Sequence, residues 1–136
     1  MEEKSEKDFT VTTAGESETL VADVEMILEV ADNLLSNAFR YASQKVGLKL
    51  TVTAQDLKMS IGDDGTGFQG NTDTVTQAFY HENPQDDLKH FGMGMYISRI
   101  YCERHGGKLL IKNAADGGAE VEAVFKNYVL EEQQQK

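Results

Sequence analysis

The sequence is poor in the features that mark secreted and membrane proteins. Cys102 is the only cysteine, so no disulfide can form within the chain, and a reducing compartment is expected. No apolar run approaches the length that spans a bilayer, and the charged start, Met1 to Asp8, is unlike a signal peptide. These absences favour a cytoplasmic domain.

Basic residues are also scarce. Lys and Arg number 13 against 23 Asp and Glu, which gives a formal net charge of −10. Nucleic acids and anionic membranes are bound by basic surfaces, so we expect neither as a partner. An acidic domain can still hold a phosphate group through backbone N–H groups, one or two cations and a divalent metal.

The chain has the size and composition of one globular domain. It has 136 residues, of which 40% are hydrophobic, enough for a single core. We therefore predict one domain over residues 1–136, with frayed ends at 1–7 and 128–136.

The hydrophobic periodicity predicts a strand, a helix, a hairpin, a long polar segment, a second helix and a second hairpin. This order predicts an α+β fold, a two-layer sandwich in which helices cover one face of a mixed, mainly antiparallel sheet. The polar segment, residues 69–91, holds the only proline, and its length is typical of a functional lid. The predicted elements are strand 9–13, helix 20–42, strands 48–54 and 57–63, helix 94–105, and strands 109–111 and 121–125.

Two rows of side chains run along the first predicted helix. The apolar row predicts the buried face. It consists of Val24, Ile27, Leu28, Ala31, Leu34, Leu35, Ala38 and Ala42. A polar row at spacings of three and four can point at one ligand. It consists of Glu29, Asn33, Asn37, Arg40 and Tyr41.

The two asparagines of the polar row have two interpretations. Asparagine is a modest helix former, so a pair within one helix favours a ligand-binding purpose. The amide oxygen of Asn37 suits Mg²⁺, and Arg40 could meet a phosphate. Equally, the row is compatible with a solvated helix face on which asparagine is tolerated.

Two glycine clusters follow, and neither has the spacing of a Rossmann or Walker motif. In the first, Asp63-Asp64-Gly65-Thr66-Gly67, glycines permit close approach of a ligand, and Asp63 could accept a hydrogen bond from an exocyclic amine. The alternative is an ordinary Asp-Gly turn. The second, Gly92-Met93-Gly94-Met95, opens a helix, where free N–H groups and the helix dipole hold phosphate. The alternative is a flexible hinge.

The histidines do not predict a metal site. His81, His90 and His105 lack zinc-ligand spacing with Cys102. We interpret His105, at a helix C-terminus where a cation is mildly favoured, as structural.

Taken together, these segments resemble the catalytic and ATP-binding domain of bacterial sensor histidine kinases, in the superfamily shared with DNA gyrase, the Hsp90 chaperones and MutL. Residues 32–42 look like the family's N box and residues 63–67 like its G1 box. Phe79 looks like the F box, and residues 90–95 look like the G2 box. The resemblance covers roughly residues 20–125, and four boxes in order are far more specific than any one.

The resemblance implies ATP and Mg²⁺ as cofactors and assigns roles to individual residues. Asn37 would hold Mg²⁺, and Asp63 would recognise the adenine amino group. The residues that would position phosphate are Asn33, Arg40 and Lys89. The remaining nucleotide contacts would be Tyr41, Gly65, Gly67, Phe79, Phe91, Gly92, Met93, Gly94 and Met95.

The resemblance also implies the reaction. In ATP-hydrolysing relatives a glutamate, four residues before the Mg²⁺ asparagine, activates water, and here that place is Asn33, which is not a base at neutral pH. Phosphoryl transfer to a protein needs mainly positioning and charge neutralisation, so the domain needs no acid or base of its own. The implied activity is transfer of the γ-phosphate to a histidine on a separate helical hairpin, which this sequence lacks.

The implied partners are that hairpin and, indirectly, a response regulator, within a membrane-anchored sensor kinase. The isolated chain is expected to be monomeric and to bind ATP without phosphorylating itself. Two alternatives remain at this point. One is an anti-sigma-type serine kinase of the same fold, and the other is a nucleotide- or protein-binding module without transferase activity.

The lid departs from the family's pattern. His90-Phe91 stands where Gly-Thr often precedes the G2 glycines, and His81 stands where an arginine often follows the F box. Since histidine titrates near neutrality, a pH-sensitive nucleotide affinity is a consequence of this reading.

Overall fold

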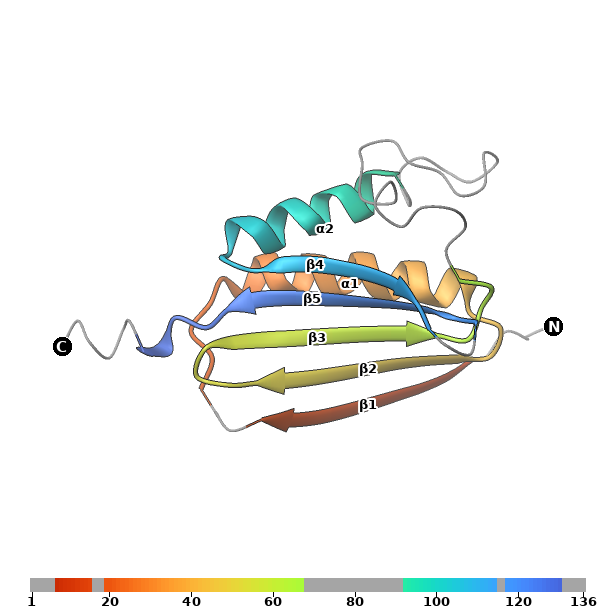
Figure 1. Cartoon of the computed structure of the whole chain (residues 1–136), viewed down its shortest axis with the longest axis horizontal. Helices are drawn as coiled ribbons and strands as arrows, with labels where there is room; N and C mark the ends of the chain where they lie inside the picture. The colour runs from red at the N-terminus through yellow and green to blue at the C-terminus, as the bar shows by residue number, and fades with distance from the viewer. Residues whose placement is uncertain (1–6, 16–18, 68–91, 115–116, 131–136) are drawn as a thin grey trace.

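The computed structural model describes residues 7–15, 19–67, 92–114 and 117–130 (Figure 1). The predicted lid therefore lies outside the described residues, with His81 and His90 and the site candidates Phe79, Lys89 and Phe91. The elements are β1 (Asp8–Gly15), α1 (Val24–Tyr41), β2 (Lys45–Val52), β3 (Asp56–Asp63), α2 (Gly92–Arg104), β4 (Lys108–Asn113) and β5 (Ala119–Lys126).

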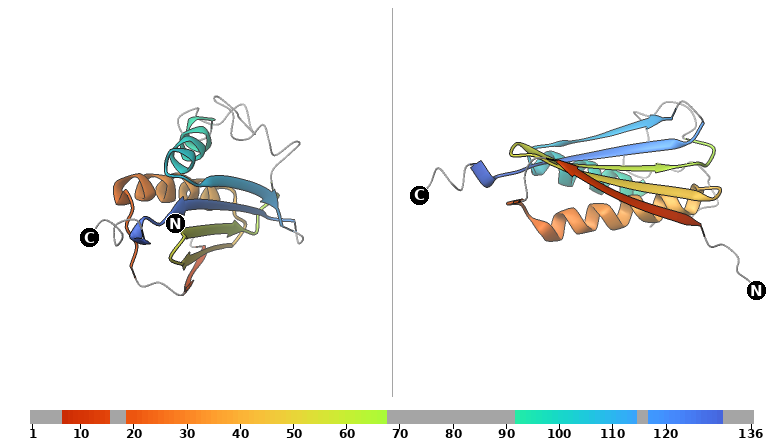
Figure 2. Two further views of the ribbon diagram at one scale, coloured as in Figure 1. Left: turned by 60° about the vertical axis from the view of Figure 1, so that its left-hand side comes forward. Right: turned by 90° about the horizontal axis from the view of Figure 1, so that it is seen from below.

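One sheet and two helices form a two-layer sandwich, which confirms the predicted α+β fold. The strand order is β1-β2-β3-β5-β4. Only β1 and β2 are parallel, because α1 carries the chain back across the sheet between them, and all other neighbours are antiparallel. Both helices lie on the same face, and the other face is left open (Figures 1 and 2).

The core lies between the helices and the central strands. On β3, Leu57, Met59 and Ile61 are buried while the residues between them face outward, which is the predicted alternation. Phe125 of β5 is fully buried. Cys102 on α2 is also fully buried, and burial raises the pKa of its thiol to about 12, so it belongs to the core rather than to chemistry.

The predicted apolar row on α1 was partly wrong. Val24 and Leu28 are 55% and 61% exposed, whereas Val30, outside that row, is fully buried. The buried positions on α1 are Ile27, Val30, Leu34 and Ala38. The reason is that α1 packs on β3 and β5, so the helix face that meets the sheet is rotated away from residues 24 and 28.

Both helices begin at different residues from those predicted. α1 starts at Val24 rather than residue 20, because the side chain of Asp23 accepts a hydrogen bond from the N–H of Met26 at 3.1 Å and caps the helix. α2 starts at Gly92, two residues earlier than predicted, and ends at Arg104. Gly106, with φ of 77°, ends it as expected for a C-terminal glycine.

His105 is structural, as predicted, but not as a cation. Its Nε2 accepts a hydrogen bond of 2.8 Å from the backbone N–H of Asp23, so this nitrogen carries no proton. The ring is buried and meets Phe125 and Tyr128 edge to face. His105 therefore ties the end of α2 to the start of α1.

The C-terminal part of the described chain is packed rather than frayed. Val129 is buried and the ring of Tyr128 packs against that of His105, whereas Leu130 is exposed. Within the described residues, neither helix is long and apolar enough to cross a membrane.

Candidate functional site

The two predicted asparagines of α1 have buried amide atoms that lack a partner. Among the described residues, nothing bonds Asn33 Nδ2 or Asn37 Oδ1, although both atoms are inaccessible to solvent. Buried polar atoms are almost always hydrogen-bonded in proteins, so these two amide atoms are available to a ligand. This observation favours the ligand-binding interpretation of the pair over the solvated helix face.

The glycine-rich start of α2 lies directly against Asn33. A Cβ atom on Gly94 would sit 3.9 Å from the Cβ and Cγ atoms of Asn33. The first turn of a helix has backbone N–H groups without partners in the helix, and these attract anions. The fold thus brings the predicted N box and G2 box together, although they lie about 60 residues apart in the sequence.

Asp63 ends β3 beside the C-terminal turn of α1. Its Oδ1 accepts a hydrogen bond of 2.8 Å from the N–H of Gly65. Burial raises the pKa of this carboxyl above its ordinary value, and the hydrogen bond from Gly65 opposes that shift. A Cβ atom on Gly65 would clash with the carbonyl oxygen of Tyr41, so glycine is required for the turn to lie against α1. The half-buried carboxylate is therefore an acceptor held in a fixed orientation.

Asp64 has a structural role that the sequence interpretation missed. Its Oδ1 accepts hydrogen bonds from the backbone N–H groups of residues 43, 44 and 45, at 2.9, 2.9 and 3.0 Å. These bonds, led by the one from Lys45, hold the pKa of this exposed carboxyl below its usual value. Asp64 thus fastens the connection between α1 and β2 to the turn after β3. Aspartate's tendency to accept backbone N–H groups near turns was the available signal.

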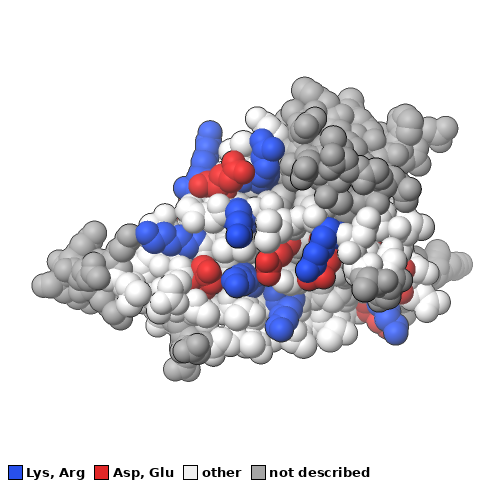
Figure 3. Space-filling view, viewed as in Figure 1, with Lys and Arg blue, Asp and Glu red and all other residues white. Residues whose placement is uncertain are grey.

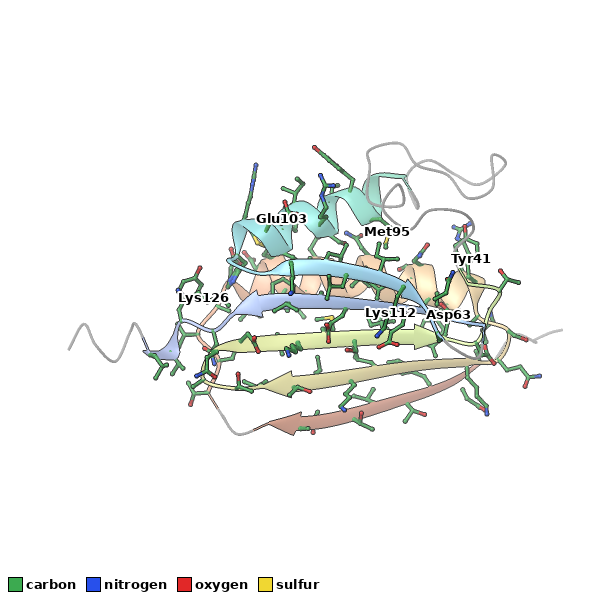
Figure 4. The ribbon with its side chains drawn as sticks, viewed as in Figure 1. Tyr41, Asp63, Met95, Glu103, Lys112 and Lys126 are labelled. Carbon is green, nitrogen blue, oxygen red and sulfur yellow. The ribbon has the colours of Figure 1, made fainter. Side chains whose placement is uncertain are left out.

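Gly67 places the end of this turn next to the β4–β5 connection. Its φ is 81°, and a Cβ atom there would lie 2.7 Å from Asn113 Oδ1 and 2.8 Å from the carbonyl oxygen of Gly117. Both the conformation and the space therefore require glycine. Figure 4 shows Tyr41, Asp63 and Met95 toward the same end of the sandwich.

Three further predicted contacts lie at the start of α2 and one lies on α1. Met95 is 3% exposed and packs in the core, so only its backbone can face a ligand. Gly92 and Met93 belong to the first turn of α2. Arg40 is exposed in the last turn of α1.

Glu29 belongs to a hollow at one end of the helix pair. It lines this hollow of about 400 Å³ together with Tyr101 and Arg104, at the N-terminal end of α1 and the C-terminal end of α2. The carboxylate thus lies away from the turn that carries Asp63. Asn33 and Asn37 are not among the residues that line this hollow.

A second hollow lies on the open face of the sheet. It measures about 460 Å³, and Gly47 and Gly62, which are paired across β2 and β3, form part of its lining. Lysines and carboxylates are interspersed over this face, and Lys112 pairs with Glu120 at 3.9 Å (Figure 3). Asp63 also lines this hollow, whereas Asn33 and Asn37 do not, so the hollow reaches the end of β3 but not the asparagines of α1.

The described residues contain no cluster of three or more His, Cys, Asp and Glu side chains that could hold a metal ion. Mg²⁺ does not need such a cluster when a nucleotide supplies phosphate oxygens and water completes the shell. The orphaned Oδ1 of Asn37 is a suitable single protein ligand for it.

Comparison with known proteins gives consistent results. A family model described as "Histidine kinase-, DNA gyrase B-, and HSP90-like ATPase" matches residues 22–128. Sensor protein KdpD of Escherichia coli K12 is 31% identical over 100 residues, covering 71% of this chain and 11% of that protein. Sensor protein FixL of Bradyrhizobium diazoefficiens is 32% identical over 108 residues, covering 76% and 21%. The chain thus spans a small part of the relatives it matches.

Solved structures share the fold. The mycobacterial sensor histidine kinase MprB superposes with a TM-score of 0.69 at 19% identity, over 88% of this chain and 84% of that one. The Acinetobacter baumannii histidine kinase AdeS gives 0.67 at 18% identity, over 88% and 55%.

Proposed function

Because this chain belongs to the family of histidine kinase-, DNA gyrase B- and HSP90-like ATPases, and matches the ATP-binding domain of its sensor histidine kinases, we propose that it binds Mg-ATP and donates the γ-phosphate to a histidine on a separate helical hairpin. The observation that carries the proposal is the pair of orphaned amide atoms on Asn33 and Asn37, next to the glycine-rich start of α2. Asp63 stands at the end of the neighbouring strand.

Each described residue has a distinct task in this proposal. Asp63, held by the N–H of Gly65, accepts a hydrogen bond from the adenine amino group and so selects the base. Asn37 Oδ1 is the protein ligand of Mg²⁺, which neutralises phosphate charge when bound. The free N–H groups at the start of α2 hold the phosphates.

Phosphoryl transfer in this domain depends mainly on how the reacting groups are positioned. Asn33 is an amide and accepts no proton at neutral pH. It therefore cannot activate a water molecule beside the nucleotide, and hydrolysis is slow. Transfer needs an in-line nucleophile and charge neutralisation, and the hairpin histidine supplies the nucleophile.

Replacing Asn37 with alanine tests the metal role. We expect the affinity for ATP in Mg²⁺ to fall roughly tenfold or more, because the ion loses its protein ligand. In EDTA the affinity should stay near that of the parent chain, since Asp63 and α2 are untouched. Titration of a fluorescent ATP analogue with and without Mg²⁺ measures both values.

Ser36→Ala, an exposed change one residue earlier on α1, is the matched control and should leave both titrations unchanged. An equal loss for Asn37→Ala with and without Mg²⁺ would show that Asn37 does not act through the metal.

The isolated chain should not label itself with radioactive ATP. Addition of the phosphoacceptor hairpin of the same kinase should yield an acid-labile, base-stable phosphate on the hairpin. An acid-stable phosphoserine on an added antagonist protein would instead identify the serine-kinase alternative, and self-labelling of the chain would contradict the proposed division of labour.

A further inference from the structure

The helical layer does not reach across the whole sheet. α1 packs on β3 and β5, and α2 packs on β4 and β5. Phe9 and Val11 on β1 are paired with Val46 and Leu48 on β2. Paired residues point to the same face of a sheet, and Val46 is buried under the helices, so Phe9 and Val11 are on the helical face. Beyond α1, the inner face of β1 and β2 is therefore without a covering helix among the described residues, as Figure 1 shows.

A second apolar wall faces this uncovered part of the sheet. Val24 and Leu28 on α1, the two residues wrongly predicted as core, continue toward the partly buried Leu35 and Phe39 at spacings of four, seven and four. The ring of Phe39 lies 5.4 Å from that of Phe9, which joins this helix stripe to the strand. We call the combined surface the β1–α1 corner. It consists of Phe9, Val11, Val24, Leu28, Leu35, Phe39, Leu48 and Leu50.

This corner gathers most of the apolar exposure of the described chain. The described residues include six exposed large apolar side chains, and four of these six belong to the corner. They are Phe9, Val11, Val24 and Leu28, and the two others are Leu110 and Leu130. Single exposed apolar residues are ordinary, but a contiguous set bordered by polar residues marks an interaction surface.

The charges that border the corner are mostly negative. On the exposed side of α1, Glu25, Glu29 and Asp32 adjoin the apolar stripe, and Arg40 is the only basic residue of this helix. β1 contains Asp8 and no basic residue, and Lys7, directly before β1, donates a hydrogen bond of 2.6 Å to the carbonyl oxygen of Phe39. A partner with basic flanks complements this border, whereas a second copy of this acidic chain would bring like charges together.

We propose that the β1–α1 corner binds an amphipathic helix of a partner protein, whose apolar stripe is flanked by Lys and Arg side chains. The corner has the form that a helix fills, with a sheet as floor and a parallel helix as one wall. A helix docked there would extend the layer of α1 and α2 over β1 and β2, about 10 Å from α1. Its apolar residues would enter the corner at helical spacing.

The proposal is independent of nucleotide binding. Asn33 and Asn37 lie on the side of α1 that faces α2, and the corner lies on the other side of the helix. Variants in the corner should thus keep their affinity for nucleotide, which also verifies that they are folded.

The test uses a fluorescein-labelled 18-residue peptide of leucine and lysine with leucines at helical spacing, in fluorescence anisotropy at physiological salt. We expect saturable binding to the parent chain, and about tenfold weaker binding to Leu28→Asp and Val24→Asp. Leu110→Asp adds the same charge to an exposed leucine on the open face, and it should bind the peptide as the parent does. Because an added carboxylate strengthens general attraction to a cationic peptide, a loss at residue 28 can only come from the apolar contact.

Several results would overturn the proposal. One is equal binding of the peptide by the parent and Leu28→Asp, and another is equal binding of a matched leucine–glutamate peptide. A third is concentration-dependent dimerisation of the parent chain in sedimentation that Leu28→Asp abolishes, since a second copy would then be the occupant. Unchanged nucleotide affinity in Leu28→Asp keeps each of these results separate from failure of the proposed kinase function.

Discussion

Asp63→Asn will bind adenine nucleotides about 100-fold more weakly than the parent chain, equivalent to roughly 3 kcal/mol. Asparagine keeps an oxygen for the N–H of Gly65, which the aspartate now accepts at 2.8 Å. Its other position carries an NH₂ group, which opposes the adenine amino group donor to donor. The change therefore removes a charge-assisted hydrogen bond and leaves two donors facing each other.

The same change should not weaken the fold. Burial raises the pKa of Asp63 above its ordinary value, so the folded chain holds this proton to a higher pH than the unfolded chain does. The protonated carboxyl stabilises the folded state, and this contribution is lost as the pH rises through the raised pKa. The ionised carboxylate therefore destabilises the folded state at pH 7. Asp63→Asn removes this destabilising charge, so the free energy of unfolding of the variant at pH 7 should equal or exceed that of the parent.

Isothermal titration calorimetry with ADP and urea unfolding at pH 4 and pH 7 measure both consequences. The stability difference between Asp63→Asn and the parent should shrink toward pH 4, where the parent carboxyl is increasingly protonated. Asp56→Asn, the same change at the other end of β3, is the control and should retain nucleotide affinity. Retained affinity in Asp63→Asn would remove Asp63 from the site, whereas lost stability would mean that the carboxylate is structural.

The architecture was predictable from the sequence because each element has its own local signal. On strand β3, the buried residues Leu57, Met59 and Ile61 alternate with more exposed residues, and Gly106 marks the end of α2, so periodicity and turn chemistry sufficed. The start of α1 was predicted too early, although Asp23, a residue type favoured at helix N-caps, was the available signal.

The burial of α1 could not be predicted for a different reason. Val24, Leu28 and Val30 are all apolar, and a helical wheel cannot tell an apolar residue that meets the sheet from one that overhangs it. Only the placement of α1 over β3 and β5 decides between them. The sequence prediction assigned a role to Asp63 and none to Asp64, and only the tertiary structure shows that Asp64 accepts hydrogen bonds from the backbone after α1.

Asn127→Ala should lower the free energy of unfolding by about 3 to 4 kcal/mol. Its side chain is 2% exposed and makes four hydrogen bonds to backbone groups. Oδ1 accepts from the N–H groups of Val21 and Val129 at 2.9 and 3.1 Å. Nδ2 donates to the carbonyl oxygens of Thr19 and Thr53 at 3.0 and 2.8 Å. Alanine leaves all four groups without this partner, so the entry to α1, the β2–β3 turn and the C-terminal end lose their common tie.

Urea unfolding measures this loss, with Gln55→Ala as control. Gln55 is an exposed amide in the β2–β3 turn, and its truncation should change the free energy of unfolding by less than about 0.5 kcal/mol. A loss below about 1 kcal/mol in Asn127→Ala would mean that water replaces the four bonds.

The two variants should have opposite phenotypes, because they act at opposite ends of the sandwich. Figure 4 places Lys126, which adjoins Asn127, at the end remote from Asp63. At a temperature where Asn127→Ala is still folded, we expect its nucleotide affinity to match that of the parent, although its stability is low. Asp63→Asn should be stable and unable to bind. That pair of results would show that the polar groups of one end hold the domain together, while those of the other end remain incompletely satisfied for a ligand.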